Sequence, residues 1–392
     1  MKGKNEVLSG WGNYPKLHTQ FIQSLSLRPT LKSIYRGLGR SYADQALSEN
    51  GQTISTLSNN RILSLQNEII KVQSGISIRE LMQALIPKGF MIAVCPGTEK
   101  ITVGGAIANN IHGKGHHIDG AFINSVKSFT LITTQGDELF CSRTTNSEFF
   151  WANAGGCGLL GLIDKVELWL KPISSAYFNT EAFKASSFAE MLELLDNQGV
   201  KSHYTVGWID ATKSKYPGVL VCGEHHKVAD NSKEYLKANL KEPLSIPELV
   251  PNGLLNSTST AVLNKIIGYK QAQTKGLVHY KPFFFPLDIL ANWNIGYGPK
   301  GFIQYQFVIP LEKGHENLKL ILLAIRKAGC LPFLNVIKRF GVCENRFLSF
   351  PIEGYTLALD FPISKTVLAL CKHLNTLVAQ MGGRVYLAKD AV

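Results

Sequence analysis

Cys95–His117, CPGTEKITVGGAIANNIHGKGHH, is the stretch that decides the fold. It holds five glycines, three histidines, two lysines and no phenylalanine, tyrosine or tryptophan, so bulk packing is not its purpose. Pro96-Gly97-Thr98 is typical of a turn, and Thr102-Val103-Gly104-Gly105 predicts a second turn that opens a short helix over residues 106–110. Glycines let backbone N–H groups approach a ligand closely, and a helix start adds positive potential.

A second glycine stretch lies upstream, at residues 36–44, RGLGRSYAD. It follows the short apolar segment Ser33-Ile34-Tyr35. Two such loops in one domain predict that a long ligand with a pyrophosphate lies across it.

Composition limits the class of protein. At 392 residues the chain has room for two domains, and 45% apolar with 18% charged residues is ordinary for a folded globular protein. The chain contains no run of eighteen apolar residues, and the N-terminal MKGKNEVLSGWGNYP lacks the apolar core of a signal peptide. We therefore expect a soluble, cytoplasmic protein.

The formal net charge of +12 has two interpretations. It reflects a generally basic surface, or it attracts an anionic substrate or membrane headgroups. Lysines and arginines are scattered and no recognised motif appears, so we expect no nucleic-acid binding. The seven cysteines are dispersed without a C-x-x-C pair, which favours reduced thiols over disulfides, and we expect no metal site.

Local patterns predict the elements of the first half. Ser77-Ile78-Arg79-Glu80 is a capping box that opens a helix, and residues 126–133 and 138–141 form a hairpin candidate. Thr145-Asn146-Ser147-Glu148 is a second capping box before EFFWANA. Residues 156–161, GCGLLG, match G-x-G-x-x-G, but they follow a helix and precede a strand, which is the reverse of the dinucleotide-binding order. We reject the Rossmann interpretation and expect this loop to pass close to the ligand.

The pattern in the second half of the sequence predicts strands that are covered by helices, and therefore an α+β domain. Helices are expected near 187–196, over 317–329 and over 365–381. The expected strands are 204–210, 218–223, 302–310, 333–340, 355–363 and 384–390. Between 224 and 285 we expect a long irregular stretch, and its part 241–262 is too long for a simple connection, which suggests a lid or substrate loop.

Several motifs together resemble the vanillyl-alcohol oxidase type of flavoenzymes. In the first half they are GLGRSYAD (37–44), PGT (96–98) with TVGGAIANNIHGKGHH (102–117), and FFWANAGGCGLLGLI (149–163). In the second half they are PNGL (251–254), FFPLD (284–288), WNIGYGPKGFIQYQFVIP (293–310), FLNVIKRFG (333–341), LSFPIEGYTLALDFPI (348–363) and GGRVYLAKD (382–390). The resemblance covers nearly the whole chain.

The resemblance implies an α+β fold of two domains: a PCMH-type FAD-binding domain over 1–175 and an antiparallel-sheet substrate (cap) domain over 176–392. Within the family the likeness is greatest to the branch that oxidises the 2′-hydroxyl of a polyprenyl-phosphate-linked ribose, the first half of epimerisation to arabinose for cell-wall arabinan. It implies a polyprenyl-phospho-sugar substrate, an NAD(P)H-dependent keto-reductase partner, and peripheral contact with a membrane surface.

The resemblance also implies the cofactor and the residues that hold it. The residues that match the family's FAD-binding motifs are Gly37, Gly39, Arg40, Ser41, Tyr42, Pro96, Gly97, Thr98, Val103, Gly104, Gly105, Ala108, Asn109, His112, Gly113, Gly158, Gly161, Ile163 and Lys389. In many relatives a histidine near Tyr42 is bonded to the flavin. Tyrosine does not form that imidazole link, so we infer noncovalent FAD.

The residues expected to take part in catalysis are His112, Gln304, Gln306, Lys338, Lys389 and Tyr42. Two of these groups have alternative interpretations. A histidine such as His112 more often has a structural role, but the resemblance implies a position beside the flavin and the sugar. His116 and His117 are expected in a loop or near phosphate. Gln304 and Gln306 point to one face of an apolar strand, where they either satisfy each other or hold a sugar with several hydroxyls.

Two lysines complete the expected site. Lys338 lies in the strand NVIKRF, where a lysine is normally a solvated edge residue, but the resemblance implies the substrate pocket. Lys389, in YLAKD, would be an exposed lysine at a strand end without the motif. The resemblance implies an active-site role, in which a fixed ammonium stabilises the negative charge that develops on the reduced flavin.

The sequence also departs from that branch. Ala358, Thr356 and Phe284 stand where it has a cysteine, an asparagine and a tyrosine, so the exact substrate is left open. Relatives continue for several dozen residues beyond the position of Val392, and we expect a shortened flavin domain. The alternative functions are therefore a sugar-lactone (aldonolactone) oxidase and an inactive, truncated relative.

Overall fold

The structure is a computed structural model that describes residues 3–23, 32–229, 233–238, 244–245, 257–344 and 346–389. Two sheets come from the first 172 residues. The smaller has the spatial order β1 (Lys4–Ser9), β2 (Lys16–Ile22), β4 (Gln52–Ser55), β3 (Ser33–Arg36). The larger has the order β5 (Ile62–Gln66), β6 (Ile69–Gln73), β10 (Gly161–Pro172), β8 (Val126–Thr133), β9 (Glu138–Ser142), with β7 (Phe90–Ile92) paired to the end of β10.

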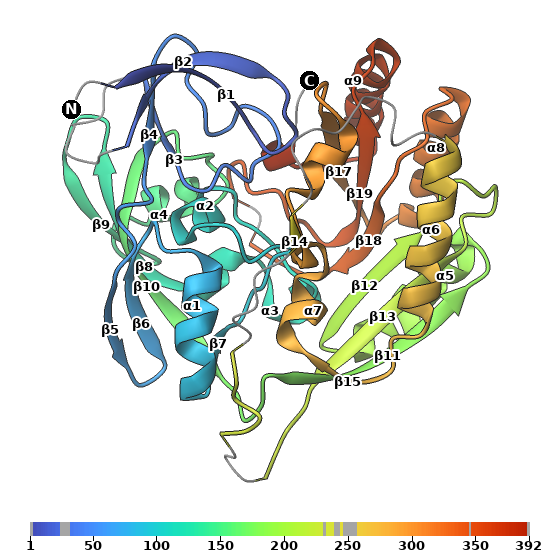
Figure 1. Cartoon of the computed structure of the whole chain (residues 1–392), viewed down its shortest axis with the longest axis horizontal. Coiled ribbons are helices and arrows are strands. Elements are labelled where there is room, and N and C mark those ends of the chain that lie inside the picture. The colour runs from blue at the N-terminus through green and yellow to red at the C-terminus, as the bar shows by residue number, and fades with distance from the viewer. Residues whose placement is uncertain are drawn as a thin grey trace.

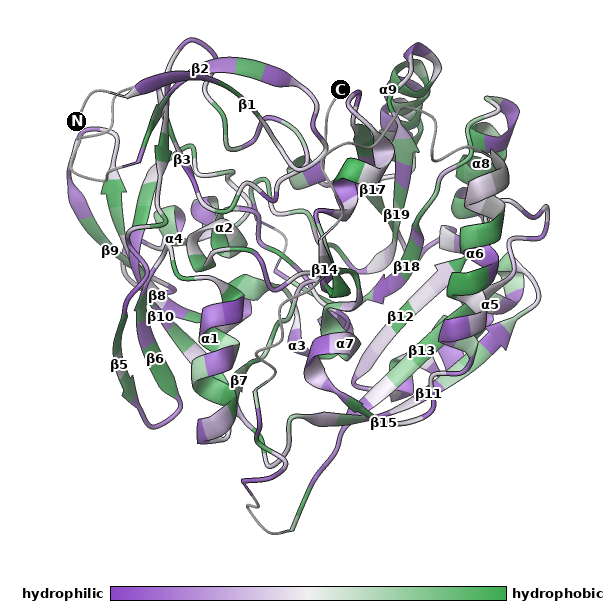
Figure 2. Ribbon diagram, viewed as in Figure 1, coloured by the Kyte–Doolittle hydropathy of each residue, from purple (hydrophilic) through white to green (hydrophobic). Residues whose placement is uncertain are grey.

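Helix α1 (Ile78–Leu85) begins where the sequence predicts. Ser77 Oγ accepts a hydrogen bond from the Glu80 amide at 3.1 Å, and the Glu80 carboxylate accepts one from the Ser77 amide at 2.8 Å. Leu81 and Leu85 are fully buried against the larger sheet. The same helix is banded green and purple in Figure 2, because its polar residues face outward.

The second capping prediction is wrong. Helix α4 (Ser147–Asn153) begins after Asn146, which has φ 46° and makes no side-chain cap bond. Thr145 instead closes a turn with Ser142, whose amide donates to the Thr145 carbonyl at 2.8 Å. The Asn146 side chain donates to the Phe140 carbonyl at 2.8 Å instead of capping the helix.

One antiparallel sheet organises the second half of the chain. Its spatial order is β15 (Gly276–His279), β11 (Tyr177–Ala185), β13 (Gly218–His225), β12 (Tyr204–Ile209), β18 (Asn335–Phe340), β19 (Gly354–Pro362), β17 (Phe302–Pro310), β20 (Arg384–Val385). Helices α5 (Phe188–Asn197), α8 (Gly314–Lys327) and α9 (Lys365–Gln380) pack against it around one apolar core. Figure 1 shows the two halves side by side, with β5–β10 on the left and β11–β13 with β17–β19 on the right.

Helices and antiparallel sheets together confirm the α+β class. The boundary at 175/176 stays a prediction; β10 ends at Pro172 in one sheet, and β11 begins at Tyr177 in another. Among the described residues, no helix is both long and apolar enough to cross a lipid bilayer.

The irregular stretch expected over 224–285 is partly wrong. It contains α6 (Ser257–Ala272), β15 and α7 (Tyr280–Phe284). The buried side of α6 carries Thr260 and Asn264 rather than an apolar stripe. Most of the expected lid, residues 241–262, and the whole of PNGL (251–254) lie outside the described residues.

Candidate active site

Two glycine loops meet at one end of a long pocket. The first, residues 37–42, follows β3, and the second leads into α2 (Val103–Ala108). Thr102 caps α2 by accepting from the Gly105 amide at 3.2 Å, and its side chain lies where a Cβ on Gly37 would stand. Gly37 therefore allows the two loops to touch, as the glycine pattern predicts.

Most of the predicted cofactor residues line this pocket. They are Gly37, Gly39, Arg40, Ser41, Tyr42, Pro96, Gly97, Thr98, Gly104, Gly105, Ala108, Asn109, His112, Gly158, Gly161, Ile163 and Lys389. Val103 and Gly113 are not among the lining residues: Val103 is fully buried in the core, and a Cβ on Gly113 would collide with the Cys95 carbonyl. Gly158 lies between α4 and β10 and Gly161 is the first residue of β10, so the GCGLLG loop passes along the pocket.

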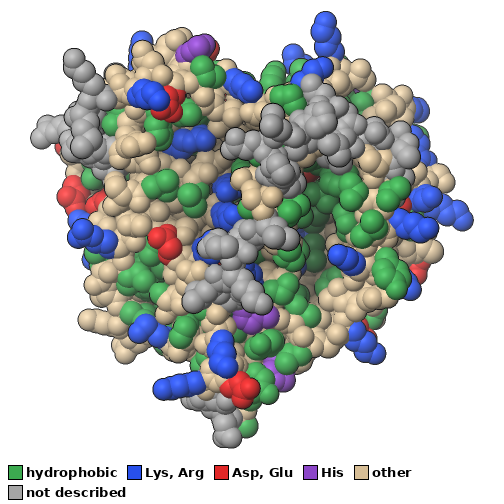
Figure 3. Space-filling view, in the orientation of Figure 1, with side chains coloured by type: hydrophobic (Ala, Val, Ile, Leu, Met, Phe, Trp, Pro, Cys, Tyr) green, Lys and Arg blue, Asp and Glu red, His purple; other side chains and the backbone are tan. Residues whose placement is uncertain are grey.

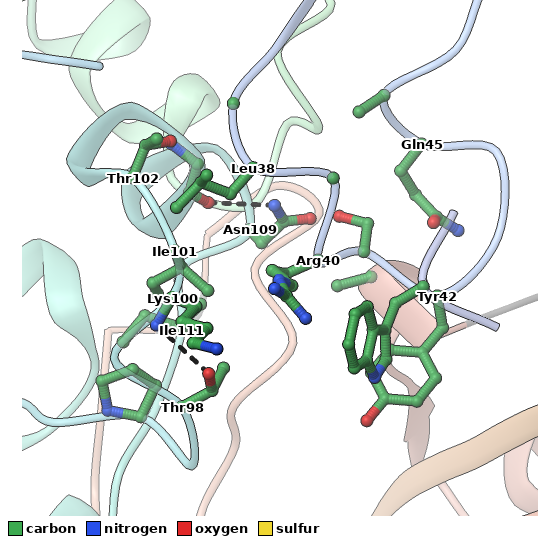
Figure 4. A pocket seen from close by; sticks show the side chains of 18 of the residues that line it. Leu38, Arg40, Tyr42, Gln45, Thr98, Lys100, Ile101, Thr102, Asn109 and Ile111 are labelled. Carbon is green, nitrogen blue, oxygen red and sulfur yellow. Dashed lines mark hydrogen bonds between the residues drawn. The ribbon is translucent and has the colours of Figure 1, made fainter. Parts of the chain in front are cut away.

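Buried polar atoms at the pocket lack partners within the described part of the chain. These atoms are Arg40 Nε, Asn109 Oδ1 and His112 Nδ1. Burial lowers the pKa of Arg40, whose guanidinium lies 3.7 Å from the centre of the Trp11 ring. Figure 4 shows Arg40, Lys100 and Thr98 around the open space of the pocket. A buried cation and unpaired polar atoms indicate a polar ligand that carries negative charge.

Asp288 closes one wall of the pocket, and sequence reasoning missed it. Its carboxylate accepts from Thr98 Oγ1 at 2.7 and 3.0 Å and from the Glu99 amide at 2.6 Å. These bonds fix the Pro96-Gly97-Thr98 turn against the segment 286–291. The only signal in the sequence is that Asp288 belongs to the motif FFPLD.

The large sheet forms another part of the pocket wall, which is called the sheet end below. Gln306 of β17 lies opposite Ala358 of β19, and Ala358 lies opposite Val336 of β18. All three line the pocket, as do Gln304 and Lys338. Lys338 is not a solvated edge residue, because β18 lies between β12 and β19.

The two amides do not satisfy each other. Gln304 Nε2 donates to Asp360 Oδ1 at 2.6 Å. Gln306 Nε2 lies 3.0 Å from His112 Nε2 and donates to Thr356 Oγ1 at 3.1 Å. With the Gln306 amide as donor, His112 Nε2 accepts and the ring proton lies on Nδ1.

The C-terminal segment joins the two ends of the pocket. The predicted strand over 384–390 is too long: β20 ends at Val385, and Lys389 lies in a 3-10 turn over Leu387–Lys389. The chain leaves the sheet because it then pairs with the first glycine loop, where the Tyr42 amide donates to the Ala388 carbonyl at 3.0 Å. This brings Lys389 Nζ to 3.4 Å from the centre of the Tyr42 ring.

Burial shifts the pKa values of the charged groups at this end. It lowers the pKa of Lys338 to about 8 and lowers that of Lys389, which the carboxylate of Asp360 partly restores. Burial likewise raises the pKa of Asp360. The pKa of His112 is held well below its usual value by burial and then by the positive charges of Lys338 and other neighbours, so its imidazole is neutral at physiological pH.

Three further predictions can be compared with the pocket. His116 packs on Phe340 with ring centres 4.1 Å apart, His117 Nε2 lies 2.8 Å from the Ser202 carbonyl, and neither lines the pocket. Of the departures from the family branch, Ala358 lines the pocket, whereas Phe284 is buried in the core and is not a lining residue. Thr356 is buried and holds Gln306.

The chain is 36% identical to decaprenylphosphoryl-β-D-ribose oxidase of Mycolicibacterium smegmatis over 372 residues, which covers 91% of this chain and 80% of that protein. The chain belongs to this family of FAD-dependent oxidoreductases. Residues 26–142 match the family model described as FAD binding domain. An uncharacterized Streptomyces coelicolor protein is 27% identical over 81% of this chain and 89% of its own length. L-gulonolactone oxidase of Bos taurus is 31% identical, but only over 43% of this chain and 38% of that protein.

FAD is therefore the cofactor of this oxidoreductase, and the pocket fits it. The family match covers both glycine loops, which lie at the same end of the pocket as the buried, unpaired Arg40 Nε and Asn109 Oδ1. Isoleucines 101 and 111 line the cavity in the same region (Figure 4). Backbone amides, a buried cation and apolar walls are the groups that a dinucleotide with flat rings requires.

Proposed function

We propose that this oxidoreductase oxidises the 2′-hydroxyl of a polyprenyl-phosphate-linked ribose to a keto sugar, with FAD bound noncovalently. The observation that carries the proposal is the convergence of polar groups from both halves at the sheet end of the pocket. His112, Gln306 and Lys338 line it together with Lys389. The mycobacterial relative, by its name, acts on decaprenylphosphoryl-β-D-ribose.

Each end of the pocket has its own task. The loop 37–42, the turn 96–98 and the start of α2 would hold the cofactor, with Arg40 near its charged part. The chemistry that FAD supplies when bound is two-electron oxidation, in which the sugar carbon loses a hydride and its hydroxyl loses a proton. Tyr42 offers no imidazole for a covalent link.

The residues of the sheet end would orient the sugar. His112 Nδ1 is a donor without a partner in the described chain, so it is available to a hydroxyl oxygen. Lys338 can hold a hydroxyl or the phosphate as a cation below pH about 8. Lys389 adds positive charge beside Tyr42, which favours negative charge developing in the pocket during oxidation. A pocket side chain or a water would accept the hydroxyl proton.

The product of this oxidation would be the substrate of a second enzyme. A 2′-keto sugar needs a reductase that delivers hydride to the other face, so an NAD(P)H-dependent keto-reductase is the expected partner for epimerisation to the arabinose form. A polyprenyl carrier is a membrane lipid, and we therefore propose peripheral contact with a membrane surface.

The test measures turnover of purified holoprotein with polyprenylphosphoryl-ribose and with an aldonolactone. Turnover is monitored as the reduction of an artificial electron acceptor. We expect turnover of the lipid-linked sugar and little of the lactone. The Lys389→Ala variant should keep its flavin absorbance and lose turnover. An exposed lysine on α9, Lys372, serves as the matched control in Lys372→Ala. Lactone turnover exceeding that of the lipid-linked sugar would refute the substrate, and unchanged turnover in Lys389→Ala would refute the role of that lysine.

A further inference from the structure

Helix α6 presents three large apolar side chains to solvent and buries polar ones, while Leu263 and Ile267 are partly buried. Val262, Ile266 and Tyr269 are 56%, 47% and 67% exposed. Their spacing of four and three residues places them in one stripe along the helix. On the other side Asn264 is 1% exposed and its amide donates to Asp210 Oδ1 at 3.1 Å. A helix that packs only on its own sheet has apolar side chains toward the sheet and polar side chains toward solvent. The exposed apolar stripe of α6 therefore indicates a surface that binds another molecule.

Lysines border the stripe on both sides. Lys265 and Lys270 are exposed and lie at helical positions on either side of Val262, Ile266 and Tyr269. The sequence from 249 to 287 contains no aspartate or glutamate, and Lys275 is exposed just beyond the helix. An outward apolar stripe bordered by cations is the arrangement of helices that lie in the interface of an anionic bilayer.

The helix lies next to the pocket on the same face of the sheet. Val336, which lines the pocket, pairs with Trp208 of β12, so both side chains are on one face. A Cβ on Gly268 of α6 would stand 2.9 Å from the Trp208 ring. The neighbouring residue of β12, Gly207, faces Met191 of α5, so α6 and α5 cover opposite faces. Strands are about 4.8 Å apart, so α6 is one strand away from the pocket wall.

The space-filling view agrees with this arrangement. Hydrophobic side chains gather on the right-hand half, beside a hollow in which lysines and arginines are visible (Figure 3). In Figure 2 helix α6 lies at the front of the right-hand half and carries green bands. Helix α6 is therefore on the same side of the molecule as the hollow.

We propose that the stripe of α6 docks onto an anionic lipid bilayer and holds the pocket at the membrane surface. The reason for such docking rests on the proposed function, since a polyprenyl-linked sugar enters from the bilayer. A second copy of this chain is the other occupant considered, but a symmetric pair would bring the lysines of two stripes together without a carboxylate on either helix. Charge complementarity favours the anionic lipid.

The experiment uses holoprotein with vesicles of phosphatidylcholine alone or mixed with phosphatidylglycerol, and measures the bound fraction by sedimentation. We expect binding to the mixed vesicles. The variant Val262→Ser/Ile266→Ser/Tyr269→Ser should bind at least about tenfold more weakly, and Lys265→Gln/Lys270→Gln on the order of tenfold more weakly. The control is Leu320→Ser/Leu323→Ser on α8, whose side chains are 54% and 47% exposed. It should bind as the wild type does.

Flavin absorbance and circular dichroism establish that each variant is folded. Unchanged vesicle binding in both α6 variants would overturn the proposal. So would a wild-type dimer that the triple serine variant dissociates, since the occupant would then be a second copy.

Turnover separates this inference from the proposed function. The triple serine variant should oxidise a water-soluble, short-chain analogue of the lipid-linked ribose at the wild-type rate and the vesicle-embedded substrate more slowly. If the wild type oxidises neither substrate, the proposed function fails, while vesicle binding still decides the role of α6.

Discussion

Replacing Lys338 by methionine should stabilise the protein at neutral pH while weakening its function. Lys338 lies in the interior of the large sheet, and burial lowers the pKa of its ammonium to about 8. A methionine has a similar length and no charge to desolvate. The variant therefore removes a cost that the wild-type fold carries in order to keep a cation in the pocket.

The size of the effect follows from proton linkage. A shift from 10.5 to about 8 corresponds to roughly 3.5 kcal/mol, since one pKa unit is worth about 1.4 kcal/mol. Below pH about 8 the ammonium is charged in both the folded and the unfolded states, and the full cost opposes folding. Between pH about 8 and 10.5 the unfolded chain binds more protons than the native one, so the stability of the wild type rises relative to the variant. Above that range the difference disappears.

The assay is urea denaturation of wild type and Lys338→Met at pH 7 and at pH 10.5. We expect the variant to be more stable at pH 7 by up to roughly 3.5 kcal/mol, and the difference to shrink to less than about 0.5 kcal/mol at pH 10.5. Comparing the two proteins at each pH cancels the titration of groups that they share. The exposed Lys319 of α8 provides the control, Lys319→Met, for which we expect no comparable change at either pH. A variant less stable than the wild type at pH 7, or a difference independent of pH, would refute the reasoning.

Three further predictions concern single groups. Acid precipitation of the holoprotein should leave its flavin in the supernatant, because Tyr42 cannot form the histidine link; flavin in the pellet would contradict this. The Asp360→Asn variant removes the carboxylate that raises the pKa of Lys389, so the alkaline fall of kcat/KM should begin at lower pH, and an unshifted profile would exclude that coupling. Ser77→Ala should lower the free energy of unfolding by about 1 kcal/mol in urea denaturation, whereas Ser77→Thr, which keeps the capping oxygen, should lose less.

Local signals account for what the sequence predicted correctly. The Ser77–Glu80 capping box, the hairpin of β8 and β9 and the glycine loops each depend on residues close together in the chain. The second capping box was wrong because a competing local turn forms there, in which the Ser142 amide donates to the Thr145 carbonyl. The predicted strand over 384–390 is also longer than β20. The chain leaves the sheet because the Ala388 carbonyl accepts from the Tyr42 amide, more than three hundred residues earlier in the chain.

The sequence by itself determined the fold class, the cofactor loops and a set of site residues, most of which line the pocket. Glycines in turns and long motifs are recognisable from residues close together in the chain. Only the tertiary structure decided that Asp288 holds the Thr98 turn and that α6 exposes three large apolar side chains. It also decided that Asp360 accepts a hydrogen bond from Gln304 and interacts electrostatically with Lys389. Each of these depends on which residues face each other across strands or between the two halves. The spacing of side chains along one segment predicts which residues share a face of a helix or strand. It does not predict which other segment packs against that face.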